Sequence, residues 1–234
     1  MRAVTCAVVG AVVHVGPAVT ALAPLRRRGL PRLSGISGSE HIALTYDDGP
    51  DPASTPAFLR LLAAHGVHAT FFLLGKFVAL HPTLVQEISA LGHELAVHGW
   101  DHRCLAWKRP GAVTTELRRT RDLIHSLTGQ QVRWYRPPYG VLTAEGMIAA
   151  RRAGLHTVLW SSWGRDWRAR ATPTSIVRTV TDSLRPGGTV LLHDTDRTSS
   201  PGSWQHTLAA SDELLRRWSA SGVPAGTLTD HMNP

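Results

Sequence analysis

The chain has 234 residues, which suits one domain with a full core, and its 43% hydrophobic content excludes a disordered or collagen-like chain. Two cysteines in a chain of this length exclude a small disulfide scaffold. The net charge of +8 comes almost wholly from arginine, but the arginines are scattered and no nucleic-acid motif accompanies them, so we expect no nucleic-acid partner.

The N-terminal segment, residues 1–28, is predicted to be a secretory signal or a membrane anchor. Residues 3–24 form a nearly unbroken apolar run that is long enough to cross a bilayer, with Arg2 before it and only arginine at 26–28. Positive charge after the run argues against simple export. We expect a membrane-anchored or secreted protein of the cell envelope, in which this segment associates with the membrane. The alternative is a cytoplasmic chain with a poorly ordered leader.

Residues 29–40 contain Pro31 and several Gly and Ser, and we interpret them as a linker to one domain at 41–234. In this domain short apolar strands alternate with amphipathic helices, as in parallel β-α units. No Gly-x-Gly-x-x-Gly fingerprint follows the first strand, so we expect a distorted (β/α) barrel of about seven units rather than an open dinucleotide-binding sheet. The strands are expected at 41–46, 68–74, 93–97, 131–135, 156–160, 188–192 and 223–228, and the helices at 54–66, 82–92, 113–129, 143–152, 173–184 and 204–218.

Polar side chains follow most of the expected strands, and loops after the strands carry the active site in such barrels. The residues are Asp47 and Asp48 after the first strand, His98 and His102 after the third, Arg136 after the fourth, Asp166 after the fifth and His193 after the sixth. His98 and His102 are spaced by one helical turn, and two histidines with a carboxylate suit zinc or another divalent transition metal. Taken alone, the Asp47-Asp48-Gly-Pro stretch could equally be a solvated turn.

With these residues in place, the chain resembles the polysaccharide deacetylases, the NodB-homology domains of carbohydrate esterase family four. It departs from the family at Gly99, where Ser or Thr is usual, and at Trp163, where many members carry Asp. Five motifs match in order, namely Thr45–Pro50 (with Tyr46 where Phe is usual), His98–His102, Tyr135–Gly140, Asp166-Trp167 and Leu191–His193.

The resemblance implies a metal-dependent hydrolase that removes N-acetyl, or sometimes O-acetyl, groups from an acetylated carbohydrate polymer such as peptidoglycan or chitin-type chains. It assigns Asp48, His98 and His102 to the metal. Zinc is the first candidate, with cobalt, nickel or manganese as alternatives.

The resemblance also implies the division of chemical labour. Asp47 would take a proton from water, Arg136 would keep Asp47 ionised, and Asp166 would hold Arg136 in place. The backbone N–H of Tyr139 would donate to the oxyanion. His193 would protonate the leaving amine, without which amide cleavage stalls.

Aromatic side chains on the same loops are expected to bind sugar, because the apolar faces of sugar rings pack on aromatic rings. The expected substrate-binding residues are Trp100, Trp163, Trp167 and Pro138. Trp160 falls within an expected strand, and we interpret it as a core residue.

Two other functional classes stay open at this point. One is a metal-dependent amidohydrolase that acts on a small non-sugar amide or imide. The other is an inactive, sugar-binding member of the family, although the presence of both Asp47 and His193 argues against it. His193 could also be a structural histidine that Asp194 satisfies. The sequence does not indicate the oligomeric state.

Overall fold

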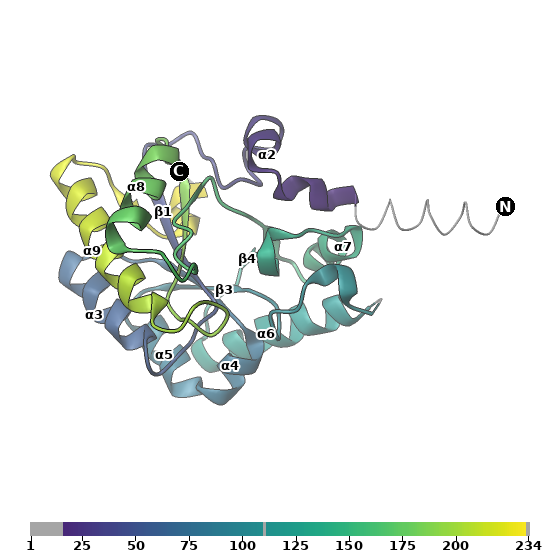
Figure 1. Ribbon diagram of the computed structural model, residues 1–234. Coiled ribbons are helices and arrows are strands. Elements are labelled where there is room, and N and C mark those ends of the chain that lie inside the picture. Colours follow the sequence, from purple (N-terminus) through teal and green to yellow (C-terminus); the bar gives the residue numbers. More distant parts are fainter. Residues whose placement is uncertain (1–15, 110, 233–234) are drawn as a thin grey trace.

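A curved, wholly parallel sheet carries the site, and its longest strand lies inside the sheet with a partner on each side (Figure 1). The computed structural model describes residues 16–109 and 111–232. The strands are β1 (Ile42–Asp47), β2 (Thr70–Leu73), β3 (Glu94–Val97), β4 (Trp134–Tyr135), β5 (His156–Thr157), β6 (Ser162–Trp163), β7 (Thr189–His193) and β8 (Ala225–Gly226). Their order is β5-β4-β3-β2-β1-β7-β6, and β8 also pairs with β1.

Helices cover the outside of this sheet, and in Figure 1 α3, α4, α5, α6 and α9 form most of the outer layer. They are α2 (Ala23–Gly29), α3 (Thr55–His65), α4 (Gly75–Leu80), α5 (Pro82–Ala90), α6 (Ala112–Thr128), α7 (Ala144–Arg152), α8 (Pro173–Ser183), α9 (Ser203–Ala220) and α10 (Leu228–Met232), with short 3-10 turns at Gly16–Ala21, Leu105–Trp107 and Pro138–Gly140. Within residues 16–109 and 111–232, no helix has the length and apolar character needed to cross a membrane.

The sequence pattern explains these elements. All six residues of β1 are buried, as expected for a strand that is covered on both faces. On α6 the side chains of Val113, Leu117 and Ile124 form the buried stripe that the sequence predicted. The helix α3 ends at Gly66, whose φ of 64° lies in the left-handed region that glycine adopts at low cost.

The prediction of a distorted (β/α) barrel is confirmed. Among the described residues the end strands β5 and β6 are not paired with each other, so the sheet forms an open half-barrel. The main difference between the predicted and the observed strands concerns residues 156–160. Only the first two of these residues pair with β4, and a separate short strand at Ser162–Trp163 pairs with β7. The chain crosses from one end of the sheet to the other between these two strands.

The segment before β1 packs on the barrel. Residues 1–15 of the predicted signal or anchor lie outside the described residues. Arg26 of α2 is buried and donates to the Trp160 carbonyl at 2.7 Å. Within 29–40, the stretch interpreted as a linker, the Gly35 carbonyl accepts from the Thr189 hydroxyl at 2.7 Å. Residues 26–37 therefore contact the domain at several points.

Candidate active site

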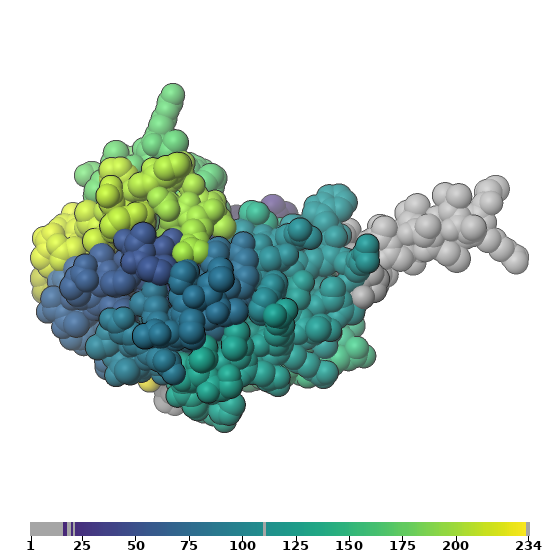
Figure 2. All heavy atoms as spheres, turned by 90° about the horizontal axis from the view of Figure 1, so that it is seen from below, coloured from purple at the N-terminus to yellow at the C-terminus, as the bar shows by residue number. Residues whose placement is uncertain are grey.

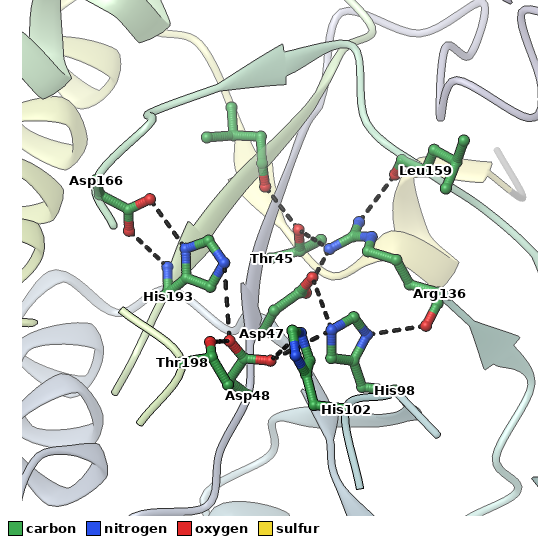
Figure 3. Close-up of polar contacts among 11 residues, drawn as sticks. Thr45, Asp47, Asp48, His98, His102, Arg136, Leu159, Asp166, His193 and Thr198 are labelled. Carbon is green, nitrogen blue, oxygen red and sulfur yellow. Dashed lines mark hydrogen bonds and ion pairs between the residues drawn. The ribbon is translucent and has the colours of Figure 1, made fainter. Parts of the chain in front are cut away.

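Two adjacent carboxylates reach the same site because the chain turns between them. Asp47 is the last residue of β1, and Asp48 follows with a φ of 80°, in the left-handed region. Neighbouring residues on a straight strand would point to opposite faces. The turn at Asp48 instead brings both side chains toward the histidines at the end of β3, as Figure 3 shows.

Asp48, His98 and His102 form a compact cluster. Oδ1 of Asp48 lies 3.3 Å from Nε2 of His98 and 3.2 Å from Nε2 of His102. One ligand atom from each residue lies within 4.8 Å of the others. Nδ1 of His98 lies 2.8 Å from the carbonyl oxygen of Arg136, which aims Nε2 at Asp48. The structure thus brings together the three residues that the sequence predicted as metal ligands.

This cluster fits a divalent metal ion. Oδ1 of Asp48 is buried and has no hydrogen-bond partner among the described residues, and an orphaned buried carboxylate oxygen is costly. Burial, more than the opposing effect of Asp48, lowers the pKa of His102 to about 4, so this imidazole is neutral and its lone pair is available. Two nitrogens and one carboxylate oxygen are the donors that zinc and related transition metals prefer.

Asp47 is bound by a fully buried arginine. Nη1 of Arg136 donates to Oδ1 of Asp47 at 2.6 Å and to the Thr45 hydroxyl at 2.9 Å, and Nη2 donates to the Leu159 carbonyl at 2.9 Å (Figure 3). The guanidinium lies over the ring of Phe72, 4.0 Å from its centroid. Arg136 is therefore held on several sides and fixes the orientation of the Asp47 carboxylate.

Asp166 binds His193 and not Arg136, which was the partner predicted from the sequence. Oδ1 of Asp166 lies 2.9 Å from Nδ1 of His193, and Oδ2 accepts the backbone N–H of His193 at 2.7 Å and the Thr207 hydroxyl at 3.0 Å. Because a carboxylate only accepts, Nδ1 carries the hydrogen. The prediction was wrong because β6 enters the sheet beside β7, which places the loop that bears Asp166 next to His193.

The environment of His193 favours its protonated form. Burial alone would lower its pKa, but Asp166, followed by Asp48 and Asp47, more than offsets this and raises the pKa to about 10. The suggestion that Asp194 satisfies His193 is not supported by the contacts, because the Asp194 carboxylate accepts a hydrogen bond from Thr55 instead. Burial raises the pKa of Asp194 to about 7.

These groups face a cleft of about 380 Å³ with an aromatic wall, which we call the aromatic recess. Its wall contains Trp160, Trp163 and Trp167, whose rings follow one another at centroid distances of 5.3 and 6.0 Å. Trp163 and Trp167 lie where the sequence predicted. Trp160, which we had interpreted as a core residue, is mostly buried but also lines the recess, so that interpretation was incomplete.

Two predicted substrate-binding residues lie elsewhere. Trp100 packs beside Gly75, and the guanidinium of Arg119 lies 3.6 Å from its ring centroid. Pro138 is buried, and its neighbour Pro137 lines the recess in its place. By contrast, its neighbour Tyr139 is 62% exposed, and its ring centroid lies 4.6 Å from that of His102.

Thr198 is a site residue that the sequence did not indicate. Its hydroxyl donates to Oδ2 of Asp48, the carboxylate oxygen that also lies 3.9 Å from Nε2 of His193. It lies in the loop after β7, a stretch rich in Ser and Thr with no motif. A sequence signal could not have found it, because only the fold brings this loop back over the end of β1.

The comparisons with known proteins agree with this geometry. The polysaccharide deacetylase family profile matches residues 35–158. The chain is 41% identical over 160 residues to a chitooligosaccharide deacetylase of Bradyrhizobium sp. (strain ANU 289), covering 68% of this chain and 73% of the relative.

Two solved structures are also similar. One is the Bc1960 peptidoglycan N-acetylglucosamine deacetylase, with a TM-score of 0.77 and 29% identity over 86% of this chain and 91% of that one. The other is a carbohydrate esterase family 4 pseudoenzyme of Bacillus anthracis, with a TM-score of 0.74 and 26% identity over 82% of this chain and 65% of that one. By its motifs, its fold and its relatives, the chain belongs to the polysaccharide deacetylase family.

Proposed function

We propose that the chain hydrolyses the N-acetyl groups of an amino-sugar oligomer or polymer. One observation carries the proposal: Asp47, His193 and the two histidines of the Asp48-His98-His102 cluster line a single recess with an aromatic wall. Hydrolysis of an amide on a sugar requires a nucleophilic water, a proton acceptor, a proton donor and a surface that binds the sugar ring.

Asp48, His98 and His102 are proposed to hold a divalent cation, and zinc is our first choice. Such a cation would polarise the acetyl carbonyl and lower the pKa of water. The donor set is consistent with cobalt, nickel and manganese as well, so metal analysis of the purified protein has to decide among them.

Asp47 is proposed to accept the proton of the attacking water. Its Oδ1 is occupied by Arg136, while Oδ2 lies 3.7 Å from Nε2 of His98 and so faces the metal cluster. The carboxylate is therefore oriented with one oxygen free for proton transfer. The backbone N–H of Tyr139, where the chain turns with a φ of 59°, is the proposed donor to the oxyanion.

His193 is proposed to deliver the Nε2 proton of its own imidazolium to the departing amine. Asp166 occupies its Nδ1, so Nε2 is the nitrogen that faces the recess, 3.9 Å from Oδ2 of Asp48. With a pKa of about 10 the imidazole is protonated at neutral pH. A group that must act as an acid needs to be in this state when the substrate binds.

The substrate class follows from the recess and from what the relatives act on. Adjacent indoles present flat apolar faces that suit sugar rings. A chitooligosaccharide and peptidoglycan are the substrates named for the two enzymes described above. We also propose that the chain works in the cell envelope, where such polymers lie, with residues 1–28 as signal or anchor; fractionation of cells tests this.

The decisive experiment is mass spectrometry of acetyl loss in the presence of added metal. N-acetylglucosamine oligomers, peptidoglycan strands and small cyclic amides are incubated with the wild type and with Asp47→Asn. We expect losses of acetyl mass from the sugars alone, and a loss at least about 10²-fold slower with the variant. Turnover of the cyclic amides alone would favour the small-amide hydrolase, and binding of oligomers without any acetyl loss would favour an inactive sugar-binding protein.

A further inference from the structure

A second recess adjoins the first on the far side of the metal cluster. It encloses about 770 Å³ and shares His102, Tyr139 and Thr198 with the aromatic recess. Beyond these three residues three cations outnumber one carboxylate, so we call it the cationic recess; its other lining residues are Lys76, Asp101, Arg103, Cys104, Trp107 and Arg197. A polymer that enters one recess can continue into the other, because both open on the same residues.

Two of these cations contact the same aromatic ring. The Lys76 ammonium lies 4.5 Å from the ring centroid of Phe77, and the Arg197 guanidinium lies 3.8 Å from the same centroid. They come from distant parts of the sequence. Figure 2 shows the yellow-green loop of residues near 197 against the dark blue segment that follows β1, and the ion pair of Arg197 with Asp51 at 2.6 Å joins these two parts. The fold thus places like charges together at the edge of the cleft.

The carboxylates nearby do not neutralise all of this charge. Arg197 has Asp51 as its partner, and Asp101 is bound at 2.7 Å by Lys108, a buried ammonium outside the recess. Arg103 also forms an ion pair with Asp101, at 3.3 Å, but its side chain is 81% exposed. Within the described residues, no acidic group lies at ion-pair distance from Lys76. Lys76 is therefore available to a negatively charged ligand, and so is Arg103, which is largely exposed and shares its carboxylate partner with Lys108.

Trp107 provides the apolar surface of this recess. Its side chain is 88% exposed at the end of a short 3-10 turn, although large aromatic side chains are usually buried. An exposed indole beside Lys76 and the exposed Arg103 offers a stacking face and a charge to the same ligand. A sugar ring that carries an anion has both matching features.

From this arrangement we infer that the cationic recess binds a sugar unit that carries a carboxylate, next to the unit that loses its acetyl group. The inference rests on the proposed function and narrows its substrate to an acidic amino-sugar polymer. Lys76 and Arg103 bind the carboxylate and Trp107 contacts the ring. Contacts of this kind favour an acidic polymer over a neutral one, and salt screens them because both cations reach solvent.

The test compares one polymer with and without its charge. Glycan strands of peptidoglycan, freed of stem peptides, carry a lactyl carboxylate on alternate sugars, and conversion of these groups to methylamides removes the charge and leaves the acetyl groups. We expect the wild type to have a kcat/KM about three- to tenfold higher on the acidic strands at low salt, and a ratio near unity at about 0.5 M salt. The double variant Lys76→Gln, Arg103→Gln should bring the low-salt ratio near unity.

Arg60→Gln is the matched control, because it removes an exposed arginine on the outer helix α3, away from both recesses. It should keep the wild-type ratio. A second variant, Trp107→Ala, should raise KM for both forms of the strands.

Equal rates of the wild type on acidic and amidated strands would overturn the inference, as would a wild-type ratio in the double variant. Neutral N-acetylglucosamine oligomers separate this failure from that of the proposed function. If these oligomers lose acetyl groups but the charge of the strands does not affect the rate, only the inferred role of the cationic recess is refuted. If no substrate loses acetyl groups, the proposed function is refuted as well.

Discussion

His193 is bound by Asp166 at two points, through its ring Nδ1 at 2.9 Å and through its backbone N–H at 2.7 Å. The double contact fixes both the position of the residue and the rotation of its ring. It also leaves Nε2 as the nitrogen that faces the recess. A histidine oriented in this way is suited to give a proton to one defined atom of a substrate.

The first prediction concerns this proton. An amine must be protonated as it leaves, whereas nitrophenolate leaves as a stable anion, so His193→Ala should reduce N-deacetylation far more than hydrolysis of a nitrophenyl acetate. Asp166→Asn should act in the same direction, because Asn offers only one acceptor oxygen for two donors. The measured quantity is the ratio of the two rates in each variant.

Thr207→Val is the control for Asp166→Asn. It removes the third hydrogen bond of Asp166, at 3.0 Å, and leaves both contacts with His193 in place. Its ratio of amide to ester rates should stay close to that of the wild type. If His193→Ala keeps the wild-type ratio too, another group delivers the proton and His193 has a structural role.

The second prediction separates the adjacent carboxylates. Asp47→Asn should bind metal as the wild type does but lose about 10²-fold or more in kcat, because it removes the proton acceptor. Asp48→Asn should bind metal far more weakly, since its carboxylate is the anionic member of the cluster. Isothermal titration with zinc measures the affinity, and acetate release measures kcat. Two variants with the same metal affinity and the same rate would contradict this division.

The sequence predicted most of the architecture because the strands and helices carry strong local patterns. The buried run of β1 and the stripe of α6 needed no tertiary information. It could not locate β6, because two residues carry no periodicity, and their pairing with β7 depends on the closure of the sheet. The same limit explains why Asp166 was assigned to Arg136 instead of His193.

In the candidate site, too, the sequence predicted some residues and not others. The motifs placed Asp47, Asp48 and His98 together because they lie at the carboxyl ends of two parallel strands, β1 and β3, that flank β2 in the sheet. Side chains that reach the site from a loop with no motif, such as Thr198, could not be predicted. Nor could the position of Trp100, since a loop residue can turn toward the cleft or toward a helix, and here Arg119 of α6 binds its ring.

The third prediction concerns stability in acid. Burial alone would raise the pKa of Asp51, but hydrogen bonds from Arg197, Ala53 and Thr195 lower it from 3.8 to about 2. Because the folded-state pKa lies below the unfolded value, ionised Asp51 stabilises the fold above about pH 4, and this contribution is lost as the pH falls toward 2. Asp51→Asn should cost about 1 to 2 kcal/mol at neutral pH and progressively less below pH 4. Urea unfolding of both proteins across this range measures the difference, and a constant difference would contradict the prediction.

The last prediction concerns the segment before β1. Arg26 is only 2% exposed, and it donates to the Trp160 carbonyl at 2.7 Å and to the Ser34 hydroxyl at 3.2 Å. Burial is the main reason that its pKa falls to about 10, so the guanidinium stays charged at neutral pH and depends on these acceptors. Arg26→Ala leaves two buried acceptors without a donor, and we expect a loss of about 2 to 3 kcal/mol in the free energy of unfolding.

Arg28→Ala provides the matched control, because Arg28 is an exposed residue of the same helix. Surface substitutions of this kind change stability by about 0.5 kcal/mol or less. Since Trp160 also lines the aromatic recess, Arg26→Ala should raise KM for the sugar substrate while kcat changes little. Urea unfolding and steady-state kinetics of the two variants give both quantities. Equal stability of Arg26→Ala and Arg28→Ala would mean that α2 does not pack on the barrel in solution, and that the folded domain begins after it.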